Sequence, residues 1–406
     1  MKKQTFIWIY VVLISISYFS SEIGLTLGGF KVNISDLLMV AFILWYLHKY
    51  QMKIKIKFRF VPEVSMWMLL VVLVIFQIPL GLINGSTVGE SIRIVRNCLY
   101  VPITFLLFDE YVDRKDVDNI TLMMALLTSL EVIIGALYLY RVNNWFMFYR
   151  ANGVFTIVLF CYLFFSINNY TKKKKILCYL SLILLLMAML LSQERTTILA
   201  SGCALVITWI VCSKNKYISR DSMRKRIGVW CTIVVVVCVT FMILNDQSVV
   251  KEYINYYFKY RMASGNFSLV NDASFQGRLL QYKNILSLDN LIYVLIGRGT
   301  GALYLAAQGM TNVVDGMLLG IFKDLGLVGV VIYLIGVFRL LRINEKETSL
   351  NTRNVFASVV SISIFMFFNP GFMGSFRFAF VLGLCIFLKK KAQENSNIDI
   401  KVKNRI

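Results

Sequence analysis

The chain has 406 residues, of which 58% are apolar and only 16% are charged, and its mean hydropathy is +0.68. A soluble chain would be about half apolar and about a quarter charged, so a soluble enzyme, a disordered chain and a secreted disulfide scaffold are excluded. The apolar residues form about a dozen continuous blocks of about 16 to 22 residues, the length that a helix needs to cross a bilayer. These blocks do not alternate as the strands of a β-barrel do, and they predict an all-α polytopic membrane protein.

In chain order, the apolar blocks predict twelve transmembrane helices. Their expected ranges are 6–21, 36–50, 64–83, 91–108, 119–140, 152–169, 176–192, 195–212, 227–244, 315–341, 354–370 and 372–388. The first block resembles a signal peptide but lacks a small-x-small cleavage site, so we interpret it as an uncleaved first helix. An even number of spans places both termini on the same side of the membrane.

The positive charges indicate which side that is. The chain carries 43 Lys and Arg against 22 Asp and Glu, a net charge of +21, which in a soluble protein would suggest a nucleic-acid partner. Here most of the basic residues lie at the N-terminus, in alternate loops such as 172–175 and 214–226, and in the tail 389–406. The positive-inside rule therefore predicts that both termini are cytoplasmic, and the charge indicates no nucleic-acid partner.

The chain is expected to be one integral membrane domain, 1–406, with one large extracytoplasmic loop at 245–312 and a basic cytoplasmic tail at 389–406. The loop is too long to be a simple connector. It contains a helical pattern over 274–288, followed by the sequence GRGTG at 297–301, which we interpret as a turn. Beyond the loop, Gly326 and Gly329 predict a short outer helix, 313–324, followed by a span that begins at 326.

Seven of the arginines on the expected outer side or at its membrane edge are candidates for a site, whereas the cytoplasmic loops carry mostly lysine. They are Arg93, Arg96, Arg150, Arg195, Arg278, Arg298 and Arg377. A guanidinium offers a planar fork of donors that suits phosphate and pyrophosphate, so this set predicts an anionic ligand at the outer leaflet. The alternative is that each arginine reaches the headgroups or pairs with a local acid. Arg195, in a very tight turn, and Arg278, within an apolar-patterned helix, favour the functional interpretation.

Two acids accompany these arginines. Asp315 opens the apolar helix after the long loop, where it could cap that helix or act as a general base. Glu194 adjoins Arg195 and could serve as the base or only orient that arginine. No group of Asp, Glu, His or Cys has the spacing of a metal site, so the sequence predicts no metal and no other cofactor.

Several segments resemble those of bacterial O-antigen and capsular polysaccharide polymerases, in the O-antigen ligase and polymerase superfamily. LLSQERTTILASGCALV is similar to their Ser-x-x-Arg helix pair. The stretch GRLLQYKNI, then VLIGRGTGAL, then NVVDGMLLGIFKDLGLVGVVIYLIGVF, is similar to their signature around the large outer loop. YRANGVF and NISDLL also resemble family segments, and the order of these landmarks is preserved along most of the chain.

This resemblance implies a metal-independent glycosyltransferase of GT-C-like architecture in the bacterial cytoplasmic membrane, with its active site facing outside. Its donor and acceptor would be polyprenyl-pyrophosphate-linked glycans, and its partners would include membrane lipid, a chain-length regulator and a flippase. Asp315, Arg195 and Arg278 would be catalytic. The other five arginines and Glu194 would bind substrate. The ligase branch carries a histidine where this chain has Asp315, which favours a polymerase, with an O-antigen ligase as the alternative.

A second alternative, from another class, is a flippase or exporter of the same lipid-linked glycan. Such a protein is expected to carry charges deep in a central cavity that opens to both sides. In this sequence the arginines and the long loop share one side, which is more typical of an enzyme.

Overall fold

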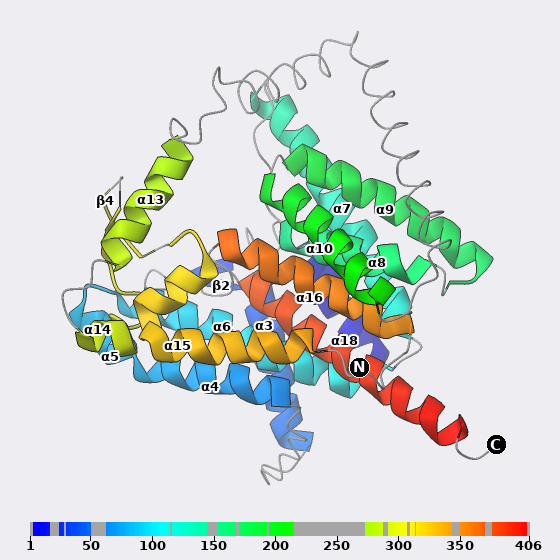
Figure 1. The fold of residues 1–406 in the computed structure, drawn as a ribbon, viewed down its shortest axis with the longest axis horizontal. Coiled ribbons are helices and arrows are strands. Elements are labelled where there is room, and N and C mark those ends of the chain that lie inside the picture. The colour runs from blue at the N-terminus through cyan, green and yellow to red at the C-terminus, as the bar shows by residue number, and fades with distance from the viewer. Residues whose placement is uncertain are drawn as a thin grey trace.

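The computed structural model describes residues 3–16, 24–27, 30–49, 62–113, 116–143, 153–167, 170–192, 195–214, 273–286, 291–306, 309–312, 314–342, 350–369 and 376–403. The helices and strands, in order, are α1 (Lys3–Ser15), β1 (Gly24–Leu27), β2 (Phe30–Asn33), α3 (Ile34–Lys49), α4 (Pro62–Phe76), α5 (Ile78–Ile83), α6 (Val88–Tyr111), α7 (Val117–Asn143), α8 (Gly153–Ser166), α9 (Lys172–Ser192), α10 (Arg195–Lys214), α13 (Ala273–Leu286), α14 (Leu291–Ile296), β3 (Tyr304–Ala306), β4 (Gly309–Thr311), α15 (Met317–Leu341), α16 (Leu350–Phe368) and α18 (Phe376–Lys403). Figure 1 shows them as a bundle of long helices with shorter elements at one end.

The helices agree with the expected spans. Every expected span overlaps a helix except 227–244, which lies outside the described residues. Four helices of the described chain are long and apolar enough to cross a membrane, namely α6, the first 22 residues of α7, most of α9, and α15. The chain is thus a helical protein with membrane-spanning helices, while the number of spans and the sidedness stay predictions.

The centre of the bundle is formed by α6, α8 and α18. Every residue of α8 is buried, as expected for a helix that is apolar on all sides. The ring centroids of Phe155 on α8 and Phe380 on α18 lie 5.5 Å apart, and Phe108 on α6 contacts both Phe380 and Phe387. Outside this core, α16 and α10 pack beside α8, α9 packs against α7, and α4 packs against α15.

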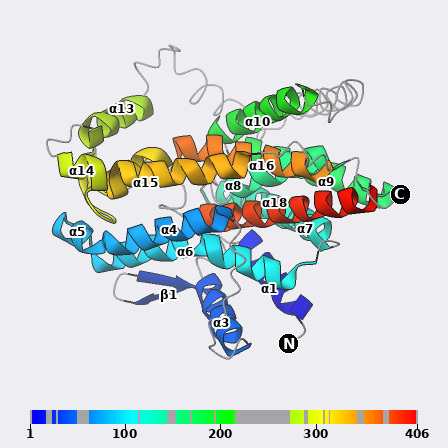
Figure 2. The same ribbon diagram turned by 60° about the horizontal axis from the view of Figure 1, so that its bottom comes forward.

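Two short antiparallel hairpins accompany the helices. The β1–β2 hairpin pairs Gly24 with Asn33 and leads directly into α3. It lies with α3 on one side of the bundle, beside α6 (Figure 2). The β3–β4 hairpin pairs Tyr304 with Thr311 and contacts α13. Both hairpins are too small to alter the helical class of the fold.

One end of the bundle, here called the lysine end, holds Lys49, Asp109, Glu110, Arg339 and the run 389–391. Lys390 Nζ lies 2.7 and 2.8 Å from the two carboxylate oxygens of Asp109, and Lys49 pairs with Glu110. Lys389 Nζ donates to the carbonyl of Arg339. These basic segments, which the sequence assigns together to the cytoplasmic side, therefore meet at one end. The expected tail is itself helical from Lys389 to Lys403, as the continuation of α18.

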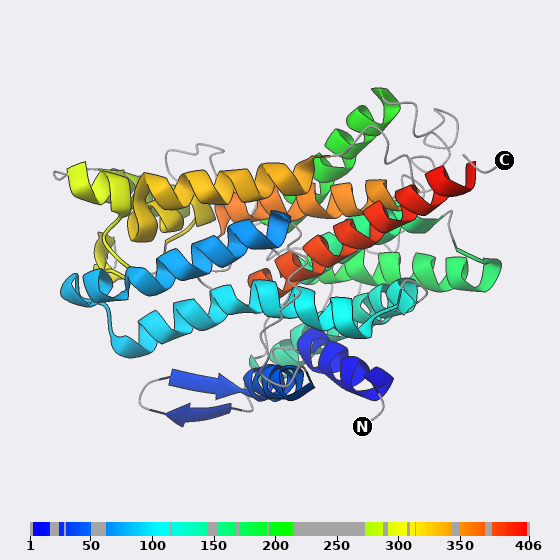
Figure 3. The same cartoon turned by 90° about the horizontal axis from the view of Figure 1, so that it is seen from below.

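The opposite end, here called the loop end, holds the turns 84–87 and 297–303, the β3–β4 hairpin and the start of α15. Figures 1 and 3 both place α5 and α14 there. The expected span 64–83 is interrupted at Gln77 between α4 and α5. The expected break at Gly326 is confirmed, since Gly326 has φ 64° and ψ −161° within α15, but the helix begins at Met317 rather than at 313.

Candidate functional site at the loop end

The turn 297–303 is packed between two helical segments that are distant in the sequence. Gly297, Gly299 and Gly301 all have positive φ (83°, 94° and 75°), which favours glycine. A Cβ on Gly299 would lie 2.0 Å from the nitrogen of Gly81 in α5, and one on Gly297 would lie 2.4 Å from the backbone of Asp324 in α15. The spacing of the glycines in GRGTG therefore serves close backbone contact with α5 on one side and α15 on the other.

Hydrogen bonds fix this turn on both sides. Thr300 donates its N–H to the carbonyl of Gln77 (3.0 Å) and its hydroxyl to the carbonyl of Val74 (2.6 Å). Asn84 donates its side-chain amide to the carbonyl of Arg298 (2.7 Å). Arg298 in turn donates its N–H to the carbonyl of Lys323 (2.7 Å). The turn thus joins α4, α5 and α15 into one unit.

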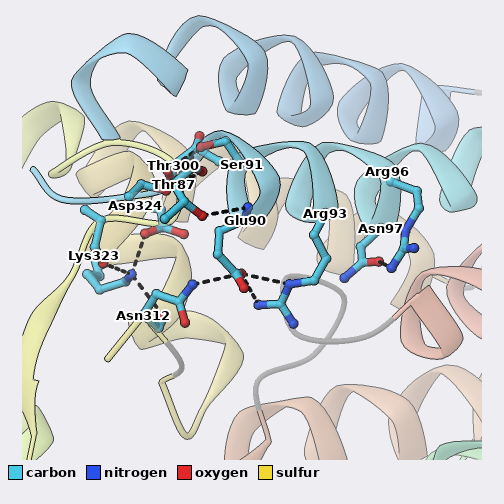
Figure 4. Close-up of polar contacts among 12 residues, drawn as sticks. Thr87, Glu90, Ser91, Arg93, Arg96, Asn97, Thr300, Asn312, Lys323 and Asp324 are labelled. Atoms are coloured by element: carbon cyan, nitrogen blue, oxygen red, sulfur yellow. Dashed lines mark hydrogen bonds and ion pairs between the residues drawn. The ribbon is translucent and has the colours of Figure 1, made fainter. Parts of the chain in front are cut away.

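A buried ion pair lies under the turn. The side chain of Lys323 is only 1% exposed, and its ammonium lies 2.8 Å from Asp324 Oδ1. The ammonium also donates to the carbonyls of Ala302 (2.6 Å) and Asn312 (3.1 Å). The N–H of Gly301 hydrogen-bonds to the Asp324 carboxylate. Since an ammonium has three donors, Lys323 holds both ends of the β3–β4 hairpin against α15 (Figure 4).

The first turn of α6 carries the next charges. Thr87 caps the helix by accepting the N–H of Glu90. Glu90 Oε2 accepts hydrogen bonds from Arg93 Nε (2.8 Å) and from the side-chain amide of Asn312 (2.9 Å). Figure 4 shows Glu90 between Arg93 and Asn312. Glu90 therefore connects Arg93 to the segment that leads into Asp315.

Asp315 lies in that segment and pairs with an arginine of α13. Arg278 Nε lies 3.4 Å from Asp315 Oδ2, and both side chains are partly exposed. The N–H of Asp315 donates to Gln281 Oε1 (3.2 Å), also on α13. The expectation that Asp315 could cap α15 is wrong, because the capping residue is Gly316 and no side chain caps there. Burial raises the pKa of Tyr304 to about 12, and the nearby Asp315 carboxylate adds to this shift.

Two predicted arginines are more buried. Arg96 Nη1 lies 3.1 Å from Asp36 Oδ2, and the hydroxyl of Tyr100 donates to Asp36 Oδ1 (2.7 Å). Asp36 belongs to α3, so this ion pair fixes α3 and the β1–β2 hairpin against α6. Arg377, at the start of α18, lies 5.8 Å from the ring of Phe376, and that ring contacts Tyr100 at 5.1 Å. Tyr100 on α6 thus contacts both Asp36, the partner of Arg96, and the ring beside Arg377.

The structure thus brings together Arg93, Arg278 and Asp315 among the predicted site residues, with Arg298 in the adjacent turn. Arg150 and Glu194 lie outside the described residues. Arg195 is the first residue of α10, and its side chain is likewise not described. Its predicted proximity to Arg278 stays a prediction.

Lys323 and Asn312 were not predicted for this site. Lys323 donates to the carbonyls of Ala302 and Asn312, and Asn312 donates to Glu90. Lys323 carried a usable signal, since a Lys-Asp pair inside the apolar stretch GIFKDLG is costly unless both charges are paired within the protein. Asn312 lies in a polar segment and had no such signal.

Comparison with known proteins gives no relative, since no family model matches the chain and no curated protein matches it. In the described ranges, no three side chains of His, Cys, Asp or Glu lie together as a metal would require. The chemistry of the loop end is therefore judged from its own groups. They include two partly exposed guanidiniums, Arg93 and Arg278, which can bind an anion through several donors, and each is paired with a partly exposed carboxylate, Glu90 and Asp315 respectively.

Proposed function

We propose that the chain is a glycosyltransferase of GT-C-like architecture that polymerises polyprenyl-pyrophosphate-linked oligosaccharide repeat units at the outer leaflet of a bacterial cytoplasmic membrane. Its product would be an O-antigen, a capsule or another surface polysaccharide. The active site is the loop end of the bundle, which the charge distribution of the sequence assigns to the outside.

One observation carries this proposal. Arg93 on α6 and Arg278 on α13 both approach the short segment that contains Asn312 and Asp315, through Glu90 in one case and directly in the other. Two arginines and a carboxylate that were singled out for an anionic donor thus converge, although they lie far apart in the sequence. The oxygens of a pyrophosphate placed there could replace the carboxylates as the acceptors that the two guanidiniums contact.

The reaction needs two functions from these groups. An acceptor hydroxyl attacks the anomeric carbon of the donor sugar, the bond from that carbon to the phosphate oxygen breaks, and polyprenyl pyrophosphate leaves. Arg93 and Arg278 stabilise the negative charge that develops on the leaving pyrophosphate. Asp315 takes the proton of the attacking hydroxyl.

The testing experiment measures the chain length of the surface glycan in a strain that carries variants of this protein. Arg278→Lys and Arg93→Lys should shorten the glycan strongly, because lysine keeps the charge but lacks the planar fork. The matched control is Arg141→Lys, which changes an exposed arginine at the end of α7 and should leave chain length unchanged.

Complete loss of the protein separates the candidate functions. Loss of a polymerase leaves single repeat units attached at the cell surface, whereas loss of a flippase leaves none there. Loss of a ligase leaves polymer on the lipid carrier. Normal chain lengths in both arginine variants, or absence of single units after deletion, would refute the proposal.

A further inference from the structure

The short helix α14 presents apolar side chains to its surroundings, although the sequence assigns it to a hydrophilic loop. Leu291 is 72% and Ile292 is 58% exposed, and Leu295 and Ile296 lie on the same face and are also exposed. Helix α5, which packs on the turn that follows α14, shows the same feature, with Ile83 80% exposed. Scattered exposed leucines are normal on a protein surface, but adjoining elements that expose apolar side chains mark a contact with another apolar phase.

The backbone of the turn that follows α14 is hydrogen-bonded within the protein, as is required of a segment inside a bilayer. Every backbone N–H from Gly297 to Leu303 finds its acceptor within the protein. The acceptors, in order, are the carbonyls of Tyr293, Lys323, Asp324 and Gln77, the Asp324 carboxylate, and the carbonyls of Gly299 and Asn84. Non-helical backbone is tolerated at membrane depth only when protein groups satisfy it in this way, whereas a loop in water has no such need.

The position of the turn along the helices gives its depth. Ser91 on α6 contacts the carbonyl of Thr300, and Asp109 marks the lysine end of the same helix. The rise per residue places these two positions about 27 Å apart. On α15, Gly326 contacts the end of α14 and is about 20 Å from Arg339. The hydrocarbon core of a bilayer is about 30 Å thick, so the turn and the end of α14 lie within its outer part.

From these three observations we infer that residues 291–303 form a re-entrant segment, whose helix α14 contacts the acyl chains of the outer leaflet. The two described elements that flank this segment in the sequence, α13 and the β3–β4 hairpin, then extend from it toward the outer surface. The occupant of the exposed α14 face is lipid hydrocarbon. This inference does not depend on the proposed enzymatic activity.

The experiment measures the depth of spin labels in lipid nanodiscs, in which both faces of the membrane meet water. Nitroxides are attached to single cysteines in a variant that lacks the native cysteines and is monodisperse. The test positions are Leu291→Cys and Ile292→Cys. The lipid control is Val331→Cys, an exposed site in the middle of α15, and the water control is Lys173→Cys at the start of α9.

The readout is the accessibility of each label to oxygen, which concentrates in hydrocarbon, relative to a water-soluble nickel chelate. Labels at both α14 positions should show a ratio close to that of the Val331 control and several-fold above that of the Lys173 control. A ratio equal to that of the Lys173 control at both positions would overturn the inference and return α14 to the aqueous loop. Two positions are used so that a local distortion by one label does not decide the result.

Discussion

The buried ion pair of Lys323 and Asp324 allows a sharp test of how the loop end is held together. Lys323→Met removes the ammonium, so the Asp324 carboxylate is left buried without its partner, and the carbonyls of Ala302 and Asn312 lose a donor. Removing one partner of a buried pair costs about 3–5 kcal/mol in the free energy of unfolding. The apparent melting temperature in detergent should therefore fall by roughly 5–10 °C.

The double variant Lys323→Met/Asp324→Leu separates the charge from the hydrogen bonds. It removes the buried unpaired carboxylate, the larger cost. The two carbonyls still lack the Lys323 donors, and the N–H of Gly301 loses its acceptor, at about 1–3 kcal/mol for that one further unsatisfied group. The double variant should thus be more stable than Lys323→Met alone, and Lys173→Met at the surface should change little. The reasoning would be refuted if the double variant melted at or below the temperature of the single one, or if Lys323→Met melted like the unmodified protein.

Three further results are expected. Asp315→Asn should fold and bind donor but extend glycan chains far more slowly; chain extension at the original rate would exclude Asp315 as the base. Gly299→Ala should cost more than about 3 kcal/mol of stability, because its Cβ would overlap α5. Gly277→Ala, in open space on α13, should instead gain about 0.5–1 kcal/mol. Equal melting temperatures of these two variants would contradict the packing of the turn. Reporter fusions at Lys173 and Ser264 should read cytoplasmic and outside respectively, and the opposite readings would reverse the membrane orientation.

The helices could be predicted because their signals are local. Apolar length set the spans, and Gly326 marked the break in α15 correctly. The helical pattern over 274–288 corresponds closely to α13, Ala273–Leu286. The interruption at Gln77 could not be predicted, because it depends on the turn at Thr300, which binds the carbonyls of Val74 and Gln77 from more than 200 residues further along the chain.

The site was predictable where residue type carried the chemistry. Arg278 and Asp315 were both selected, and they form an ion pair. Arg96 was also selected, but it pairs with Asp36, which Tyr100 also hydrogen-bonds, in the packing of α3 on α6. A sequence alone does not tell a guanidinium that holds two helices together from one that meets a ligand, because both need an arginine near an acid.

The pairing of α6 with α18 at the lysine end also has a consequence for biosynthesis. Asp109 and Lys390 are 281 positions apart in the sequence, and the helices that carry them form the centre of the bundle. A ribosome must add 281 residues after Asp109 to reach Lys390, so α6 lies in the membrane with Asp109 unmatched and its aromatic face uncovered until α18 is made. Closure of the bundle is therefore a late, post-insertion event. A chain truncated before α18 would present an incomplete core to the quality-control proteases of the membrane.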